Sequence, residues 1–346
     1  MNNNIKVSIT NWGNHNGNNI YLFKLENPSG AYVEVSNYGA TLVSIVVPDK
    51  NGELYHAILG FPTLQGYLDD TCYIGSTIGR YANRIGGAAF SLNGQEYCLE
   101  ANEGVNTNHG GYAGMNTKTF KYELLDDTVC FSIESPDGEA GFPGNLNSKI
   151  TYTWTAGNEL IIHYLATSDK QTVVNFTNHA YFNLSGEEKI FDHEVSVYAD
   201  HVLEKDQQNI PTGFIKAAGT LKFNNSSIGS KVQQQEGKTF GVNDCYVLNA
   251  ENGNGLKLAA MLTDTKKARR LTVFTDYPSV MVYSGDALFS EHSGHLSKPY
   301  ASFDGICFEC QYYPDSPNHR HFPSTVLEPA ETYDKTIIYQ FGSSEH

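Results

Sequence analysis

Short apolar runs with a period of two recur along the chain, and clusters of turn-forming residues separate them. Side chains alternate between the two faces of a β-strand, so each run predicts a strand with one buried face. Two such runs joined by a short Gly- or Asn-containing turn predict a hairpin of antiparallel strands. Three hairpins are predicted in this way: Val43–Pro48 with Leu54–Leu59, Ala89–Leu92 with Glu96–Leu99, and Ile150–Thr155 with Glu159–Ala166.

Helical patterns are confined to short pieces such as Thr63–Asp69. A parallel α/β sheet requires crossover helices of about a dozen residues between its strands, and no sustained helical stripe is present. No repeat of fixed period indicates a propeller or a solenoid. The sequence therefore predicts an all-β fold with few short helices. The expected architecture is a large antiparallel β-sandwich with a groove on one sheet face and a long surface loop over Thr220–Asn243.

The composition narrows the class of partner. The chain has 346 residues, a formal net charge of −15 and only five Arg. A phosphate backbone requires a basic footprint, so the charge argues against nucleic acid and anionic membranes as partners. The basic run Lys266–Arg270 is predicted to form a solvated turn. Since neither a membrane-spanning apolar stretch nor a secretory signal pattern is visible, we predict a cytoplasmic protein.

The segment Thr177–Gly186 reads TNHAYFNLSG and contains a candidate catalytic histidine. Along one strand over residues 174–184, alternation directs Phe176 and Phe182 toward a core and puts His179 and Tyr181 on the polar face. An ordinary solvated sheet face is the alternative interpretation. A single histidine in a strand does not decide between the two.

A second candidate lies near the end of the chain, in CFECQYYPDSPNH. Alternation puts Cys307, Glu309 and Gln311 on one strand face, with Phe308 and Cys310 on the other. Burial of a carboxylate is costly unless it has partners, so Glu309 in an aromatic-rich segment is noteworthy. The alternative is an ordinary solvated glutamate.

Metal and redox sites are poorly supported by the spacing of their potential ligands. Cys307 and Cys310 point to opposite faces of a strand and have no second ligand pair, which disfavours zinc or thioredoxin chemistry. The six cysteines are scattered, in agreement with a reducing compartment. A catalytic metal held by His109, His179 and Glu309 lacks a local ligand motif. We therefore predict no metal site.

Two loops offer further polar groups. The glycines that follow Asn108 and His109 allow a tight loop that presents the His109 imidazole. In GRYANRI, Asn83 and Arg84 carry planar side chains with several donors, which suit sugar hydroxyl groups. Both could instead satisfy loop carbonyls, the role that we assign to Arg80.

Five motifs stand out along the chain: GRYANRI at 79–85, NHGG at 108–111, TNHAYFNLSG at 177–186, NDCYVL at 243–248 and FECQYYPDSPN at 308–318. In this order and with these separations, they resemble the aldose 1-epimerase (galactose mutarotase) family. The resemblance runs from about residue 37 to about residue 329. It implies a single aldose 1-epimerase domain over residues 1–346, with the family's galactose mutarotase-like sandwich and a sugar in an open groove.

The resemblance also implies roles for individual residues. His179 is similar to the family's general acid and Glu309 to its general base, while His109 is similar to the histidine that holds the sugar and assists at the ring oxygen. One position departs from the family pattern, because Met281 stands where many relatives have Gln, and the preferred sugar is therefore open. The expected substrate contacts are Asn83, Arg84, His109, Tyr181 and Asp244.

The implied reaction interconverts the α and β anomers of free aldohexoses such as galactose and glucose. A base removes the proton of the C1 hydroxyl while an acid protonates the ring oxygen; rotation about C1–C2 and reclosure then give the other anomer. Each such group typically contributes about 10²–10⁴ in rate, and the reaction requires no cofactor. We expect a monomer or weak homodimer acting on a monosaccharide.

Three alternative functions remain. A hexose-6-phosphate 1-epimerase would need several Arg or Lys at the groove. A glycoside hydrolase would need two carboxylates that flank the scissile bond. A non-catalytic sugar-binding protein of the same fold would not need the acid and the base.

Overall fold

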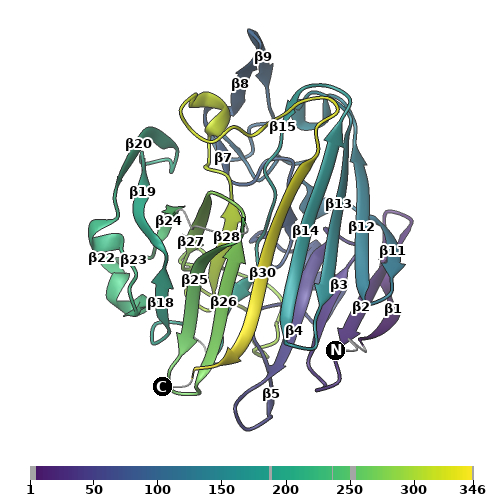
Figure 1. The fold of residues 1–346 in the computed structure, drawn as a ribbon, viewed down its shortest axis with the longest axis vertical. Coiled ribbons are helices and arrows are strands. Elements are labelled where there is room, and N and C mark those ends of the chain that lie inside the picture. The colour runs from purple at the N-terminus through teal and green to yellow at the C-terminus, as the bar shows by residue number, and fades with distance from the viewer. Residues whose placement is uncertain (1–4, 187–188, 236, 250–254, 345–346) are drawn as a thin grey trace.

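Strands make up most of the regular secondary structure in a computed structural model that describes residues 5–186, 189–235, 237–249 and 255–344. A nine-stranded sheet faces the viewer, and a six-stranded and a five-stranded sheet lie behind it (Figure 1). Every pair of named strands is antiparallel, for example β13 with β14 and β27 with β28. The predicted all-β sandwich is therefore confirmed.

The nine-stranded sheet supplies one wall of the core. Along β13, Ile150, Tyr152 and Trp154 are buried, whereas Thr151 and Thr153 between them are half-buried and Lys149 is exposed. The Trp154 indole and the Tyr152 hydroxyl donate to backbone carbonyls of the N-terminal region, over 3.2 and 2.7 Å. In spatial order the sheet contains β11 (Lys121–Leu125), β12 (Thr128–Ser135), β13 (Leu146–Trp154), β14 (Glu159–Ser168), β30 (Tyr333–Ser343), β26 (Arg269–Thr275), β25 (Lys257–Asp264), β18 (Glu194–Val197) and β21 (Ser226–Ser227).

The other two large sheets close the core from behind. Phe308 and Val280 of the six-stranded sheet and Phe23 of the five-stranded sheet belong to one continuous apolar cluster with Tyr152. The six-stranded sheet contains β17 (Tyr181–Phe182), β28 (Ile306–Gln311), β27 (Ser279–Tyr283), β24 (Asn243–Leu248), β19 (Ala199–Lys205) and β20 (Pro211–Ala217). The five-stranded sheet contains β1 (Lys6–His15), β2 (Asn18–Glu26), β3 (Tyr32–Ser36), β4 (Thr41–Pro48) and β5 (Leu54–His56).

Short elements connect the large sheets. The two-stranded sheets are β6 (Thr77–Ile78) with β16 (Thr177–Asn178), β7 (Arg84–Ile85) with β10 (Thr107–Asn108), β8 (Ala89–Leu92) with β9 (Gln95–Cys98), β15 (Thr172–Val173) with β29 (Val326–Leu327), and β22 (Gln233–Gln235) with β23 (Lys238–Phe240). The helices are α1 (Leu64–Leu68) and the 3₁₀ turns η1 (Gly86–Ala88), η2 (Met115–Thr117), η3 (Glu139–Gly141), η4 (Gly219–Leu221), η5 (Ile228–Lys231) and η6 (Ser316–Asn318). Among the described residues, every helix is too short to span a bilayer.

The predicted hairpins are all present. They are β4 with β5, β8 with β9, and β13 with β14, and the predicted helical piece contains α1. Arg80 has the expected structural role, because its guanidinium donates to the carbonyls of Ser135, Pro136 and Pro143 over 2.7–2.9 Å. All six cysteines are free thiols.

Three expectations need correction. The expected strand over 174–184 is divided between β16 and β17, and the residues from Val174 to Leu184 are buried on both sides because other elements cover them. Arg269 in the basic run is buried rather than solvated, since it donates to the Leu184 carbonyl and stacks on the Tyr55 ring. The expected loop over 220–243 contains short pieces of structure, including the hairpin of β22 and β23.

Candidate active site

A polar hollow of about 420 Å³ lies at the six-stranded sheet and is lined by residues from distant parts of the chain. Its volume falls in the range of small-molecule sites. Six of the seven predicted site residues line it: Asn83, Arg84, His109, His179, Tyr181 and Glu309.

His179 and Glu309 meet because their strands are paired. His179 lies two residues before Tyr181 of β17, which is the register partner of Cys307 on β28, and Glu309 follows on the same face. His179 Nε2 lies 3.7 Å from Glu309 Oε1, and the two side chains are only 5% and 3% exposed. Glu309 Oε2 is buried and accepts no hydrogen bond from the described residues. An imidazole and a carboxyl group thus face each other, and the second carboxyl oxygen, Oε2, has no hydrogen-bond partner among the described residues.

Burial shifts both ionisable groups toward their neutral forms. Loss of solvent lowers the pKa of His179 to about 4 and raises the pKa of Glu309 to about 8, with the nearby Arg84 charge opposing the second shift. Between these values the unliganded pair holds one exchangeable proton, which rests on Glu309. Because the two groups lie so close, ionisation of one influences ionisation of the other.

The His109 loop is held by reciprocal backbone contacts with Asn83. The His109 N–H donates to the Asn83 carbonyl over 3.1 Å, and the Asn83 N–H donates to His109 Nδ1 over 3.2 Å. Both residues have positive φ values, 52° and 64°. Gly110 is required here, because a Cβ on it would lie 2.2 Å from the Gly79 carbonyl oxygen. The loop geometry expected from the glycines is therefore present.

This contact also fixes the tautomer of His109. A ring nitrogen that accepts an N–H carries no proton, so the neutral imidazole has its proton on Nε2. Burial lowers the pKa of His109 well below its ordinary value, which keeps the ring neutral. His109, His179 and Glu309 have ligand atoms within 4.8 Å of one another. A metal ligand needs an unprotonated nitrogen, so the His109 tautomer suits a hydrogen-bond donor better than a metal ligand.

The remaining predicted contacts are held by neighbours at the rim. Arg84 forms a bidentate ion pair with Glu103, with N–O distances of 2.5 and 2.8 Å. The Tyr181 hydroxyl donates to the Cys72 carbonyl over 3.1 Å, so its oxygen can still accept. Both side chains are thus pre-oriented at the hollow.

Asp244 differs from the other predicted contacts. Its neighbour Asn243 lines the hollow, whereas Asp244 does not and pairs with Lys205 over 3.1 Å. Alternation along β24 puts the two on opposite faces. A sugar contact by Asp244 stays a prediction, and Asn243 is the pocket-lining residue that the motif did not single out.

Residues 21–340 match the family model described as Aldose 1-epimerase. The chain belongs to the aldose 1-epimerase family. It is 37% identical to galactose mutarotase from Bos taurus over 315 residues, covering 90% of this chain and 91% of the relative. It is 35% identical to aldose 1-epimerase from Escherichia coli K12 over 329 residues, covering 92% and 94%. The chain is accordingly an isomerase with mutarotase function.

Solved structures of aldose epimerase relatives have the same fold. Galactose 1-epimerase from Lactobacillus acidophilus NCFM aligns with a TM-score of 0.84 at 26% identity, over 99% of this chain and 100% of that chain. A GalM/aldose epimerase homologue from C. elegans aligns with a TM-score of 0.86 at 28% identity, over 92% and 97%. The galactose mutarotase-like sandwich implied by the motifs is confirmed.

Sequence reasoning missed part of this aldose epimerase pocket. Tyr73 packs against both histidines, with ring centroids 4.7 Å from His109 and 5.9 Å from His179. Its loop is held by Asp70, whose carboxylate accepts from the backbone N–H groups of Cys72 and Ile74. The signal available in the sequence was only the turn-forming pair of aspartates at 69–70.

The unusual Met281 does not line the pocket. It is the register partner of Glu309, but its side chain packs with Cys245, Tyr313 and Phe322 in a small apolar cluster. Any effect of Met281 on the preferred aldose would act through this packing, and such an effect stays a prediction.

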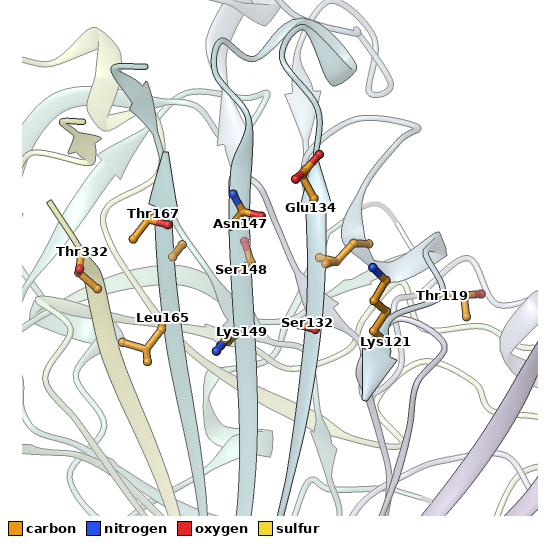
Figure 2. Close-up of a pocket in the computed structure, with 12 residues that line it drawn as sticks. Thr119, Lys121, Ser132, Glu134, Asn147, Ser148, Lys149, Leu165, Thr167 and Thr332 are labelled. Carbon is orange, nitrogen blue, oxygen red and sulfur yellow. The ribbon is translucent and has the colours of Figure 1, made fainter. Parts of the chain in front are cut away.

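A larger hollow, of about 730 Å³, lies at β11 to β14 of the nine-stranded sheet. Its polar side chains, including Lys121, Glu134 and Asn147, are spread along neighbouring strands and do not converge on one point (Figure 2). It contains no histidine beside a carboxylate. Size alone therefore does not distinguish the candidate site, whereas a histidine beside a carboxyl group does.

Proposed function

We propose that the chain interconverts α and β anomers of free aldohexoses such as galactose and glucose, using His179 and Glu309 as the proton-exchanging pair. The observation that carries the proposal is the 3.7 Å separation of His179 Nε2 and Glu309 Oε1 in a buried polar pocket of about 420 Å³. Ring opening requires one proton to leave the C1 hydroxyl while another reaches the ring oxygen, and one acid and one base suffice.

The proton balance of the cycle is closed. In the assignment implied by the motifs, Glu309 takes the C1 hydroxyl proton while imidazolium His179 protonates the ring oxygen, the ring C1–O bond breaks and an aldehyde forms. After rotation about C1–C2, the C1–O bond forms again on the other carbonyl face. Glu309 then returns its proton to the new C1 hydroxyl and His179 recovers its own. The enzyme ends as it began.

This assignment requires the sugar to change where the shared proton rests. The unliganded pair holds that proton on Glu309, whose pKa is about 8, rather than on His179, whose pKa is about 4. Sugar hydroxyls that donate to the unsatisfied Glu309 Oε2 would stabilise the carboxylate and favour imidazolium. Binding of the substrate thereby prepares the charged pair for ring opening.

The other pocket residues hold the substrate. The His109 Nε2–H group, fixed by the Asn83 backbone, would donate to the ring oxygen or a neighbouring hydroxyl. Asn83, Arg84, Tyr181 and Asp244 are proposed as contacts to the remaining hydroxyls. Such directed hydrogen bonds position the ring for reaction. Neither a metal nor a cofactor takes part in the proposed cycle.

The rim charges favour a neutral sugar over a hexose 6-phosphate. Arg84 is the cation among the described residues that line the hollow, and it is already paired with Glu103. A phosphate dianion would have to displace that carboxylate. A purely binding role leaves the buried acid and base without a purpose, since burial of both groups is costly.

Polarimetry tests the proposal directly. Fresh α-D-galactose should lose its optical-rotation transient faster with the protein than in buffer, and His179→Ala should return the rate to that of buffer. Equal relaxation with wild type and buffer would disprove the proposal. Rates for glucose, xylose and maltose measured in the same way would rank the substrates.

The domain extent, the location and the oligomeric state of the chain are further proposals. We infer a single catalytic domain over residues 1–346, supported by the continuous family match over 21–340. We infer a cytoplasmic location from the scattered free cysteines, which agree with a reducing compartment, and we propose a monomer or weak homodimer. Size-exclusion chromatography with light scattering tests the oligomeric state.

A further inference from the structure

The imidazole of His179 is contacted on both ring nitrogens by side chains of one strand. Glu309 Oε1 lies 3.7 Å from Nε2, and Cys307 Sγ lies 3.6 Å from Nδ1. Cys307 and Glu309 are two residues apart on β28, so they share a strand face and are separated by roughly 7 Å. The two side chains therefore reach the two ring nitrogens from neighbouring positions on one strand face. Strand β28 therefore brackets the ring.

Burial defines the chemical state of the thiol. Cys307 is fully buried, and loss of solvent raises its pKa well above the ordinary value, so it stays an uncharged S–H group. An uncharged sulfur is a weak donor and a weak acceptor, and sulfur hydrogen bonds are longer than those between nitrogen and oxygen. The 3.6 Å contact is thus a weak hydrogen bond whose direction depends on the His179 tautomer.

The opposite side of the ring indicates that direction. Around neutral pH the unliganded Glu309 is protonated, since its pKa is about 8, and its O–H needs an acceptor. The nearest ring nitrogen is Nε2, at 3.7 Å from Oε1, so a lone pair there faces both this carboxyl and the pocket. A neutral imidazole has one N–H, so the proton then lies on Nδ1 and is donated to Cys307 Sγ.

We propose that Cys307 is a positioning residue that holds His179 with its proton on Nδ1 and directs the Nε2 lone pair toward Glu309 and the sugar. The expected effect of Cys307 on catalysis rests on the proposed function, whereas the predicted tautomer of His179 does not depend on it. When Nε2 gains a proton during the reaction, the Nδ1–H bond to sulfur is kept, so the ring need not rotate. Without the thiol, the ring can rotate or exchange tautomers, and fewer encounters are productive.

The chain provides a matched control on the same strand. Cys310 is fully buried, like Cys307, but it belongs to the main apolar core on the other side of β28. Truncation of either thiol leaves a similar void. Only truncation of Cys307 removes the contact to His179.

The experiment combines NMR with kinetics on the full chain. Protein labelled with ¹⁵N at histidine is compared with Cys307→Ala, Cys307→Ser and Cys310→Ala at pH 7, and the His179 signals are assigned by their loss in His179→Gln. We expect a protonated Nδ1 in wild type and in Cys310→Ala, and a mixture of tautomers in Cys307→Ala. We expect kcat of Cys307→Ala to fall about 10- to 100-fold with KM within about two-fold, as for a misoriented catalytic group. Cys307→Ser should recover the Nδ1 tautomer and most of kcat, because its hydroxyl oxygen also accepts.

The measurement on wild type decides the case even if Cys307→Ala does not fold. A proton on Nε2 of His179 in wild type overturns the inference, as does a Cys307→Ala protein with unchanged tautomer and kcat. Loss of the Nδ1 proton in Cys307→Ala, in a protein whose wild type lacks mutarotation, supports the contact and disproves the proposed function instead.

Discussion

Two histidine–carboxylate pairs lie on different sheets and differ in almost every respect except composition. On the nine-stranded sheet, His163 Nε2 lies 2.8 Å from Asp334 Oδ1, with side chains 35% and 63% exposed. At the six-stranded sheet, His179 and Glu309 are farther apart, at 3.7 Å, and almost fully buried. The exposed pair forms the closer contact, yet solvent reaches both of its side chains. The buried pair has the shifted pKa values that proton exchange requires.

The difference shows that removal of solvent, rather than proximity, prepares a pair for chemistry. Water stabilises both charged forms of an exposed pair and leaves little to gain from their attraction. In the buried pair, each charged form loses its hydration, so the neutral forms are favoured and the proton rests on the carboxyl until a bound group stabilises the charged forms.

Catalysis should provide the largest contrast. Glu309→Gln keeps the shape of the side chain but cannot accept or return a proton, so kcat should fall by about 10²–10⁴. His163→Ala should keep the wild-type kcat, since its ring lies on the outer face of β14. Polarimetry with galactose measures both. A Glu309→Gln enzyme with more than half of wild-type kcat would rule out the carboxyl as a reacting group.

The pH dependence should follow the buried pair alone. Below about pH 4 both His179 and Glu309 are protonated and no base is left, and above about pH 8 the pair loses its only proton and no acid is left. We therefore expect kcat/KM to be level between these values and to fall about ten-fold per pH unit outside them. His163→Ala should have the same profile. A profile with one break near pH 6.5 would instead indicate a solvated histidine.

Stability should reveal the energetic cost of the buried carboxyl. The pKa of Glu309 rises from an ordinary 4.5 to about 8 on folding. The free energy of unfolding is therefore highest below pH 4.5 and decreases as the pH rises toward 8. Glu309→Gln removes the ionisation, and at pH 7 it should increase the free energy of unfolding by up to about 3 kcal/mol. At pH 4.5 its effect should vanish. Thermal melts at both pH values check this, and equal melting temperatures at pH 7 contradict it.

Changes in substrate affinity should show which of two neighbouring residues, Asn243 or Asp244, contacts the sugar. Asn243→Ala removes a pocket-lining amide and should raise KM about three- to ten-fold, the value of one hydrogen bond. Asp244→Asn, which weakens the pair with Lys205 outside the hollow, should raise KM less. Galactose saturation curves compare the two variants. A larger effect at Asp244 would support the contact implied by the sequence motif.

The smallest effect is expected from the exposed pair itself. A double-mutant cycle of His163→Ala and Asp334→Ala should give a coupling free energy of about 0.5 kcal/mol or less, as is usual for solvent-exposed ion pairs. Urea unfolding at low salt measures it. A coupling above about 2 kcal/mol would mean that distance matters more than burial in this protein.

The main features of the fold could be predicted from local sequence. The hairpin of Ala89–Leu92 with Gln95–Cys98 follows from a period-two pattern around Asn-Gly, which specifies both strand faces and the turn. Division of the 174–184 segment could not be predicted in this way. Its residues are apolar or uncharged on both faces because other elements cover both, so the alternation carried no information on where pairing stops.

The sequence by itself determined the antiparallel hairpins and the family, because periodicity, turn chemistry and motif order can be read along the chain, and it predicted the acid and the base. Only the tertiary structure decided which groups lose solvent and which ring nitrogen faces which partner. Cys307 at Nδ1 of His179, the Asn83 backbone at Nδ1 of His109, and Asn243 rather than Asp244 at the hollow all depend on strand register and loop packing. Since pKa values and tautomers follow from burial and directed contacts between distant segments, no local pattern contains them.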